Sequence, residues 1–220
     1  MFIPLRDENP TRRFPVVTIL LIAANAAIFL CQAFSPLGLA HYVQRMGLIP
    51  FEISHFQSAA EGARLSPPLT LLSAMFLHGS LFHLAGNMLF LWIFGNNVED
   101  FLGPLRFGLF YLISGLGASF FQVVLSPNSR VPMIGASGAI AGVLGAYFLL
   151  YPGARVLTLV FLWIIPIPAA FVLGLWFVLQ VLNVGMGGGV AWFAHIGGFL
   201  VGLALVKPLA GRSRRLARSN

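Results

Sequence analysis

The sequence has few charged residues and almost no cysteine. Only 9% of its 220 residues are Asp, Glu, Lys or Arg, whereas about 25% are charged in soluble domains. Hydrophobic residues make up 58%, and the mean hydropathy is +0.89. These values argue against a soluble domain and predict an integral membrane protein. Because Cys31 is the one cysteine, an intrachain disulfide and a cysteine metal site are both excluded.

Acidic residues are missing altogether after Asp100. The later apolar segments therefore lack the paired carboxylates of an aspartyl protease, and a serine nucleophile there would have no acidic third partner. His78 and His83 are five residues apart, not four as in an H-E-x-x-H zinc helix. We therefore expect no metal and no cofactor, and a Ser-His dyad is the serine mechanism left open.

Basic residues outnumber acidic ones by 13 to 6, which gives a net charge of +7. They gather outside the two ends of the apolar region: Arg6, Arg12, Arg13, Lys207, Arg212, Arg214, Arg215 and Arg218. Such clusters are typical of the cytoplasmic ends of membrane proteins. We therefore expect cytoplasmic termini and a lipid bilayer as partner, with no nucleic acid.

The apolar residues fall into six segments that could each cross a bilayer, which takes about 20 residues in a helix. They are residues 14–34, about 81–98, about 107–125, 136 to just before Pro152, about 156–182 and about 191–206. Residues 35–79 are too polar to span and predict a structured loop at the membrane surface. The expected fold is an all-α membrane protein, a six-span bundle over 14–206, with a cytoplasmic segment 1–13 and a basic tail 207–220.

Three polar residues are expected at one depth of this bundle. With both termini inside, the second, fourth and sixth segments all enter from the outer side. His83, Ser137 and His195 lie within the first turns of these segments. At about 1.5 Å per helical residue, all three lie in the outer third of the membrane.

Ser137 and His195 are the candidate nucleophile and base, since a serine hydroxyl attacks only when a base takes its proton. Small residues follow one face of each of their helices, with Gly138 and Gly142 in one and Ala194, Gly198 and Gly202 in the other. Such stripes let membrane helices approach closely. The sequence therefore predicts a hydrogen bond between Ser137 and His195.

An oxyanion formed by attack of Ser137 would need hydrogen-bond donors. Free backbone N–H groups at the start of the fourth segment, including that of Ser137, are suited to this. His83 and Asn87 are four residues apart, so they share a helix face and offer further donors. Interhelical hydrogen bonding is the alternative role for both.

Several motifs together resemble the rhomboid family of intramembrane serine proteases. They are "HGSLFHLAGN" before and within the second segment, "GASG" at the start of the fourth, "AHIGGFLVG" in the last, and the N-terminal "IPLRDENPTRRFPVV". The resemblance implies a six-span fold and cleavage of transmembrane segments of other proteins. It implies that Ser137 is the nucleophile, His195 the general base and acid, and His83 and Asn87 the oxyanion-hole side chains. Gly135 matches a glycine whose backbone lies close to the site, and Glu99 a structural glutamate.

The sequence departs from the family pattern at two places. "LT" (69–70) stands where many members have a Trp-Arg pair, and Ala141 stands where many have an aromatic ring that packs on the histidine. The second departure predicts a less firmly positioned His195.

Two other functions remain open. One is a proteolytically silent rhomboid-like protein that binds transmembrane helices, although such relatives usually lack the serine or the histidine. The other is a small transporter that uses His83 and His195, although the sequence shows no inverted repeat. The expected location is a prokaryotic inner membrane, with the site facing outside.

Overall fold

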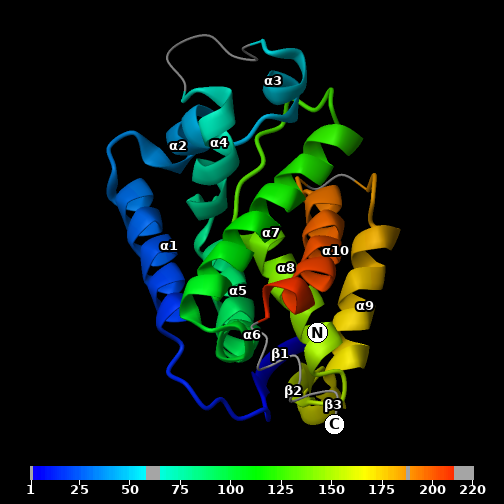
Figure 1. The fold of residues 1–220 in the computed structure, drawn as a ribbon. Coiled ribbons are helices and arrows are strands. Elements are labelled where there is room, and N and C mark those ends of the chain that lie inside the picture. Colours follow the sequence, from blue (N-terminus) through cyan, green and yellow to red (C-terminus); the bar gives the residue numbers. More distant parts are fainter. Residues whose placement is uncertain (1, 58–64, 187–188, 211–220) are drawn as a thin grey trace.

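The computed structural model describes residues 2–57, 65–186 and 189–210, and it is mostly helical (Figure 1). The helices in the expected spans are α1 (Val16–Phe34), α5 (Leu81–Phe90) continued by the π-helical turn η2 (Leu91–Gly95) and α6 (Asn96–Leu102), α7 (Pro104–Leu125), α8 (Ser137–Leu150), α9 (Ala169–Leu182) and α10 (Trp192–Leu209). By length and composition α1, α7 and α10 could each cross a membrane, and a bent pair, Pro67–Phe76 with Leu81–Leu102, could add a fourth span. Within the described residues α8 and α9 are shorter apolar helices, so the count of six spans stays an expectation.

A small sheet replaces the beginning of the expected fifth span. β2 (Arg155–Val160) and β3 (Trp163–Pro168) form an antiparallel hairpin, and β1 (Phe2–Asp7) pairs with β2, which gives the order β1-β2-β3. The prediction of a helix from residue 156 was wrong. Pro166 and Pro168 lack backbone donors, which a helix interior needs but an edge strand such as β3 can do without. The expected N-terminal segment 1–13 thus contains a strand.

The predicted loop between the first two spans contains short helices. They are α2 (Gly38–Met46), α3 (Pro50–His55), α4 (Pro67–Ser73) and the 3-10 turn η1 (Ala74–Phe76). Figure 1 shows these helices at one end of the bundle and the sheet at the other. Residues 58–64 of this loop, residues 187–188 and residues 211–220 of the predicted basic tail lie outside the described residues.

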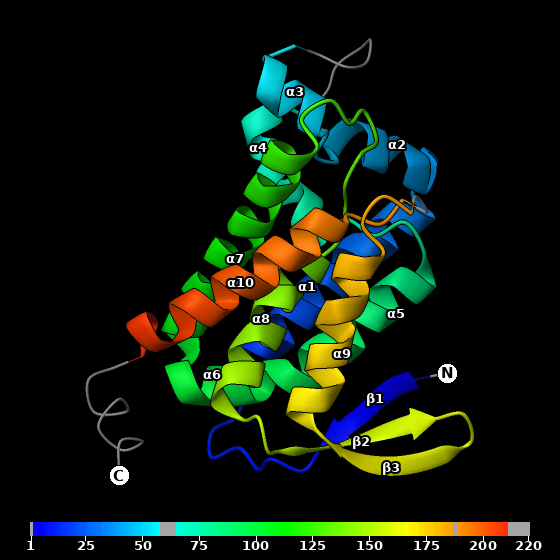
Figure 2. The ribbon, with the colours of Figure 1, turned by 90° about the vertical axis from the view of Figure 1, so that its right-hand side faces the viewer.

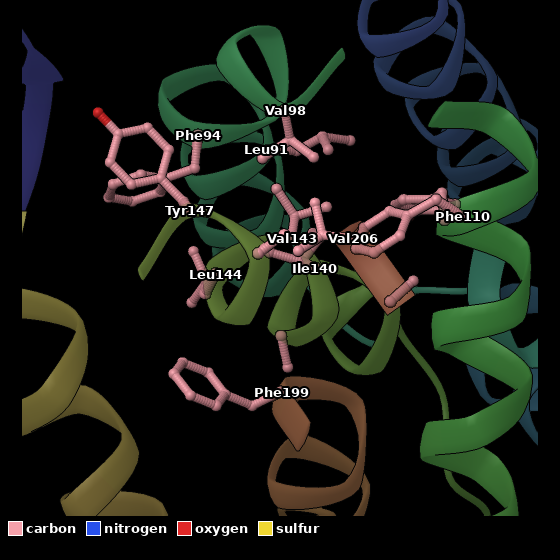
Figure 3. Packing of buried hydrophobic residues seen from close by; sticks show 14 of the residues in the cluster. Leu91, Phe94, Val98, Phe110, Ile140, Val143, Leu144, Tyr147, Phe199 and Val206 are labelled. Carbon is pink, nitrogen blue, oxygen red and sulfur yellow. The ribbon is translucent and has the colours of Figure 1, made fainter. Parts of the chain in front are cut away.

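Helix α8 lies at the centre of the bundle, between α7, α9 and α10 (Figure 2). Ten of its 14 residues are buried, and Ile140, Val143, Leu144 and Tyr147 contribute to the main core (Figure 3). Its 14 residues span about 21 Å, less than the roughly 30 Å of a hydrocarbon core. α8 is therefore too short to cross such a core by itself, and Ser137 is its first residue.

The small-residue stripes bring the backbones of α8 and α10 into contact. A Cβ added at Gly198 would overlap the carbonyl oxygen of Gly138, and one added at Gly202 would overlap that of Gly142. The close approach predicted from the two stripes is confirmed. It fixes the position of His195, which lies on α10 one turn before Gly198.

The sheet is tied to the bundle through Asp7. Its Oδ2 accepts hydrogen bonds from the Tyr147 hydroxyl of α8, at 2.7 Å, and from Asn97 Nδ2 of α6, at 2.8 Å. Burial raises the pKa of the Asp7 carboxyl, and these hydrogen bonds offset part of that rise. β1 is thereby fixed to the end of α8 farthest from Ser137.

Glu99 of α6 caps the beginning of α1. Its carboxylate accepts hydrogen bonds from the backbone N–H groups of Val17 and Thr18, at 2.9 and 2.8 Å, and from the Thr18 hydroxyl at 2.8 Å. Helix starts leave N–H groups without intrahelical partners, and a carboxylate there also interacts favourably with the helix dipole. The expected structural role of Glu99 thus has a physical basis, a link between α1 and α6.

Glu99→Gln is expected to lower the free energy of unfolding by about 2 kcal/mol, because an amide nitrogen cannot accept the Thr18 hydrogen bonds and a buried donor loses its partner. Reversible unfolding in mixed detergent micelles measures this difference. Glu8→Gln, an exposed carboxylate at the same end of the molecule, is the matched control and should change stability by no more than about 0.5 kcal/mol. Equal effects of the two substitutions would contradict the capping role.

Candidate active site

Ser137 lies at the beginning of α8 because the chain before it turns sharply. Gly135 adopts a φ of +116°, a backbone conformation that residues with a side chain rarely adopt. Its N–H donates to the carbonyl oxygen of Ala74 at 2.8 Å, which ties the turn to η1. As the first residue of α8, Ser137 has a backbone N–H without an intrahelical acceptor.

The Ser137 hydroxyl lies beside the imidazole of His195. The distance between Ser137 Oγ and His195 Nε2 is 2.8 Å, although the residues are 58 positions apart. This is the hydrogen bond expected from the two glycine stripes. With its hydrogen directed at Nε2, the hydroxyl can lose its proton to the imidazole.

Gln180 of α9 contacts the other ring nitrogen of His195, and the sequence analysis missed it. The Gln180 Oε1 atom lies 2.8 Å from His195 Nδ1, and Gln180 Nε2 donates to the carbonyl oxygen of Trp176 at 3.0 Å. The signal was an amide side chain within an otherwise apolar helix, which is unfavourable in a membrane without a partner. The sequence could not tell which residue it contacts.

Two tryptophans flank the imidazole. The ring centroid of Trp176 lies 5.8 Å from that of His195, and Trp192 meets it edge-on at 6.3 Å. Ala141, where an aromatic ring was expected from the family pattern, is buried and faces Gly198. Gln180 and Trp176 of α9 lie beside the ring instead, and a less firmly positioned His195 stays a prediction.

His83 and Asn87 of α5 face the same space as Ser137. Atoms of the His83 ring lie 2.8 Å from where a Cβ of residue 135 would be, so glycine is required at that position. Asn87 Nδ2 lies 3.0 Å from Nε2 of the fully buried His78, which holds the amide in place. His78 thus supports Asn87 from the short segment between η1 and α5.

These side chains line a cavity of about 570 Å³. Its polar lining includes His83, Asn87, Ser137 and His195, and its apolar lining includes Trp176. Gly189, between α9 and α10, also lines it. Within residues 2–57, 65–186 and 189–210 there is no group of three His, Cys, Asp or Glu side chains that could hold a metal ion.

The remaining predicted residues belong to the helix contacts around this cavity. Gly138 packs closely against Ala118 of α7, and Gly198 against Gly138 and Ala141. The structure therefore brings together Ser137, His195, His83, Asn87, Gly135, Gly138 and Gly198. It adds Gln180, Trp176 and His78.

Comparison with known proteins gives one consistent result. Residues 67–212 match the family model described as "Rhomboid domain". The chain is 33% identical over 146 residues to "Rhomboid protein 1, mitochondrial" of Saccharomyces cerevisiae, and 42% identical over 136 residues to "RHOMBOID-like protein 2" of Arabidopsis thaliana. It is 33% identical over 188 residues to the mouse "Presenilin-associated rhomboid-like protein, mitochondrial". The matches cover 61%, 61% and 83% of the chain, but only 40%, 40% and 46% of the respective relatives.

Proposed function

The chain belongs to the rhomboid family, and from this premise we propose that it is a serine endopeptidase that cleaves transmembrane segments of other proteins by a Ser137–His195 dyad. The observation that carries the proposal is the 2.8 Å contact between Ser137 Oγ and His195 Nε2 at the wall of a 570 Å³ cavity. The rhomboid domain is the unit from about residue 14 to 206 in this proposal. Neither metal nor cofactor takes part.

In the first half of the proposed reaction, Ser137 Oγ attacks the carbonyl carbon of the substrate peptide bond while its proton passes to His195 Nε2. The carbonyl oxygen becomes an oxyanion. The backbone N–H of Ser137 and the side chains of His83 and Asn87 are the proposed donors to it. His195 then gives the proton to the leaving amine as the C–N bond breaks, and an acyl-enzyme remains.

In the second half, a water molecule in the cavity attacks the acyl carbon and passes a proton to His195 Nε2. A second oxyanion forms at the same donors. It collapses as the bond to Ser137 Oγ breaks and His195 returns the proton to that oxygen. The new carboxyl end leaves, and the dyad is restored.

The cavity supports a substrate in extended conformation. Attack requires an accessible carbonyl group, which a helix engages in its own hydrogen bonds. We therefore propose as substrates transmembrane proteins whose helices unwind readily near one membrane surface. The distribution of arginines favours cytoplasmic termini and a site near the opposite face, as expected for a prokaryotic inner membrane protein.

Labelling with a fluorophosphonate tests whether the chain is an enzyme. The reagent reacts with an activated serine, so the wild-type protein is expected to be labelled at Ser137 and Ser137→Ala to remain unlabelled. Ser114→Ala, at a buried serine of α7, is the matched control and should label like the wild type. A silent helix-binding protein would not be labelled. If the protein is not labelled but proteoliposomes show a flux of protons or ions that is lost without His195, a transporter would be favoured.

Gly135→Ala is expected to lower kcat by about 100-fold. The free energy of unfolding should fall by less than the free energy that corresponds to this loss of rate. A Cβ at a φ of +116° is strained and would meet the His83 ring at 2.8 Å, which displaces a proposed oxyanion donor. Cleavage of a reporter transmembrane substrate measures the rate. Gly153→Ala, at a position with nothing within 4 Å of the added atom, is the control. An unchanged kcat in Gly135→Ala would argue against His83 as a donor.

A further inference from the structure

We propose that Gln180 is a positioning residue for His195 and acts as a neutral third member of the Ser137–His195 pair. This inference rests on the proposed function. It follows from the chain of hydrogen bonds that links α9, α10 and α8. Because the sequence has no acidic residue after Asp100, an acidic third partner is not available in these helices.

The carbonyl oxygen of Trp176 fixes which end of the Gln180 amide faces the imidazole. A backbone carbonyl only accepts hydrogen bonds, so the group 3.0 Å from it must be the amide nitrogen. The amide oxygen then faces His195 Nδ1 at 2.8 Å. Because an amide oxygen only accepts, Nδ1 must carry the hydrogen.

The tautomer of His195 follows from this arrangement. A neutral imidazole with a proton on Nδ1 has its lone pair on Nε2, the atom 2.8 Å from the Ser137 hydroxyl. That is the tautomer able to take the serine proton. When Nε2 is protonated during the reaction, Nδ1–H continues to donate to Gln180, so the ring does not rotate as its charge changes.

A glutamine suits this place better than a carboxylate would. Gln180 is only 7% exposed and lies in an apolar helix. An ionised side chain within a membrane is costly, whereas an amide orients the ring without a charge. Gln180 and Trp176 are one helical turn apart, so one face of α9 supplies both the acceptor for Nδ1 and a ring beside the imidazole.

The first experiment replaces Gln180 in the full-length protein, in detergent, with a reporter that the wild type cleaves and Ser137→Ala does not. That pair tests the proposed function by itself. Gln180→Met keeps the length but removes the acceptor, and we expect kcat to fall about 10- to 100-fold with KM within about twofold. Gln180→Glu restores most of the rate, because a carboxylic acid can accept from Nδ1–H and donate to the Trp176 carbonyl. Leu179→Met, on the exposed side of α9, should match the wild type.

A second measurement reads the tautomer directly and requires no change at Gln180. Nitrogen-15 NMR of histidine-labelled wild-type protein, with the His195 signals identified by their loss in His195→Ala, should show the proton on Nδ1. A proton on Nε2 would overturn the proposal. So would a Gln180→Met protein with unchanged kcat, or a Gln180→Glu protein as slow as Gln180→Met while folded.

A separate observation concerns the tip of the β2–β3 hairpin. From it we propose that the tip, residues 161–165, inserts into the lipid bilayer at the surface opposite the Ser137 end. Phe161, Leu162, Trp163, Ile164 and Ile165 are 76%, 91%, 75%, 60% and 43% exposed. A contiguous apolar surface of this kind marks a contact with membrane or protein.

Four features favour lipid as the occupant. Figure 2 shows the strands running across the end of the helices, with the hairpin extending sideways past α9, as an element in the plane of a membrane surface would. Phe171, in the first turn of α9, is also exposed, at 60%. Arg6 and Arg155, both exposed, lie at the other end of the strands, beside the helix ends, where they can meet anionic headgroups. Tryptophan is also enriched at membrane interfaces.

An environment-sensitive dye tests the insertion. In a Cys31→Ser background, a cysteine is introduced by Leu162→Cys or, as control, by Gly153→Cys in the exposed turn before β2, and the protein is reconstituted into vesicles. The dye at position 162 should emit at shorter wavelength and be quenched by lipids with a nitroxide on the acyl chain, whereas the dye at 153 should not. Quenching by an aqueous reagent alone at 162 overturns the proposal. So does a shielded dye that lipid nitroxides leave unquenched, which would indicate a protein partner or a second copy.

Discussion

Ser137→Ala, His195→Ala and the double variant are expected to cleave a reporter substrate at one common residual rate, about 10⁴- to 10⁶-fold below the wild type. The hydroxyl and the imidazole 2.8 Å away act in the same proton transfer, so removing either abolishes that step and removing the second costs nothing more. If the two residues acted independently, the rate losses of the two single variants would multiply in the double variant. Product formation on gels over long incubation measures all three variants against the wild type.

The control for this prediction is that each variant remains folded, which its unfolding midpoint measures. The close packing of α8 on α10 is made by glycines that these substitutions leave in place, so each variant should unfold close to the wild-type midpoint. A double variant clearly slower than both single variants would show that the two residues act separately. Cleavage by Ser137→Ala at the wild-type rate would mean that another group, or a contaminating protease, attacks the peptide bond.

Gly202→Ala is expected to destabilise the protein by about 3 kcal/mol, near the upper end of the range for overpacked cores. The added Cβ would overlap the backbone of Gly142, and a backbone carbonyl has no rotamer with which to move aside. α10 must shift away from α8, which also separates His195 from Ser137. Activity should therefore fall together with stability. Unfolding in mixed micelles and reporter cleavage on the same preparation measure both.

Gly174→Ala supplies the matched comparison in a neighbouring helix. There the added Cβ would lie 3.7 Å from the nearest atom, in the Phe148 ring, which is an ordinary contact. Because alanine favours a helix over glycine by about 0.8–1.0 kcal/mol, Gly174→Ala should leave the protein as stable or more stable. Replacing glycine by alanine is thus expected to lower the stability at residue 202 and to keep or raise it at residue 174. Similar effects at both would contradict the close packing of α8 on α10.

The sequence predicted the helices with long apolar runs better than it predicted the segment at 155–168. α1, α7 and α10 begin and end within a few residues of the expected spans, because hydrophobic length alone identifies a membrane helix. The β2–β3 hairpin is equally apolar, so hydropathy could not separate it from the helix that follows. Its pairing with β1 joins residues about 150 positions apart, and no local pattern reports such a contact.

The sequence by itself determined that this is a membrane protein, which segments carry its polar residues, and that Ser137 and His195 can meet. Those conclusions follow from hydropathy, from the spacing of small residues and from similarity of motifs, all of which are local along the chain. Only the tertiary structure decided that Gln180 faces Nδ1 of His195, that Trp176 flanks the ring and that His78 holds Asn87. The physical reason is that a side chain's partner depends on how each helix is rotated and placed against the others. That rotation is fixed by packing between distant segments, and for α8 and α10 by the contact between their backbones.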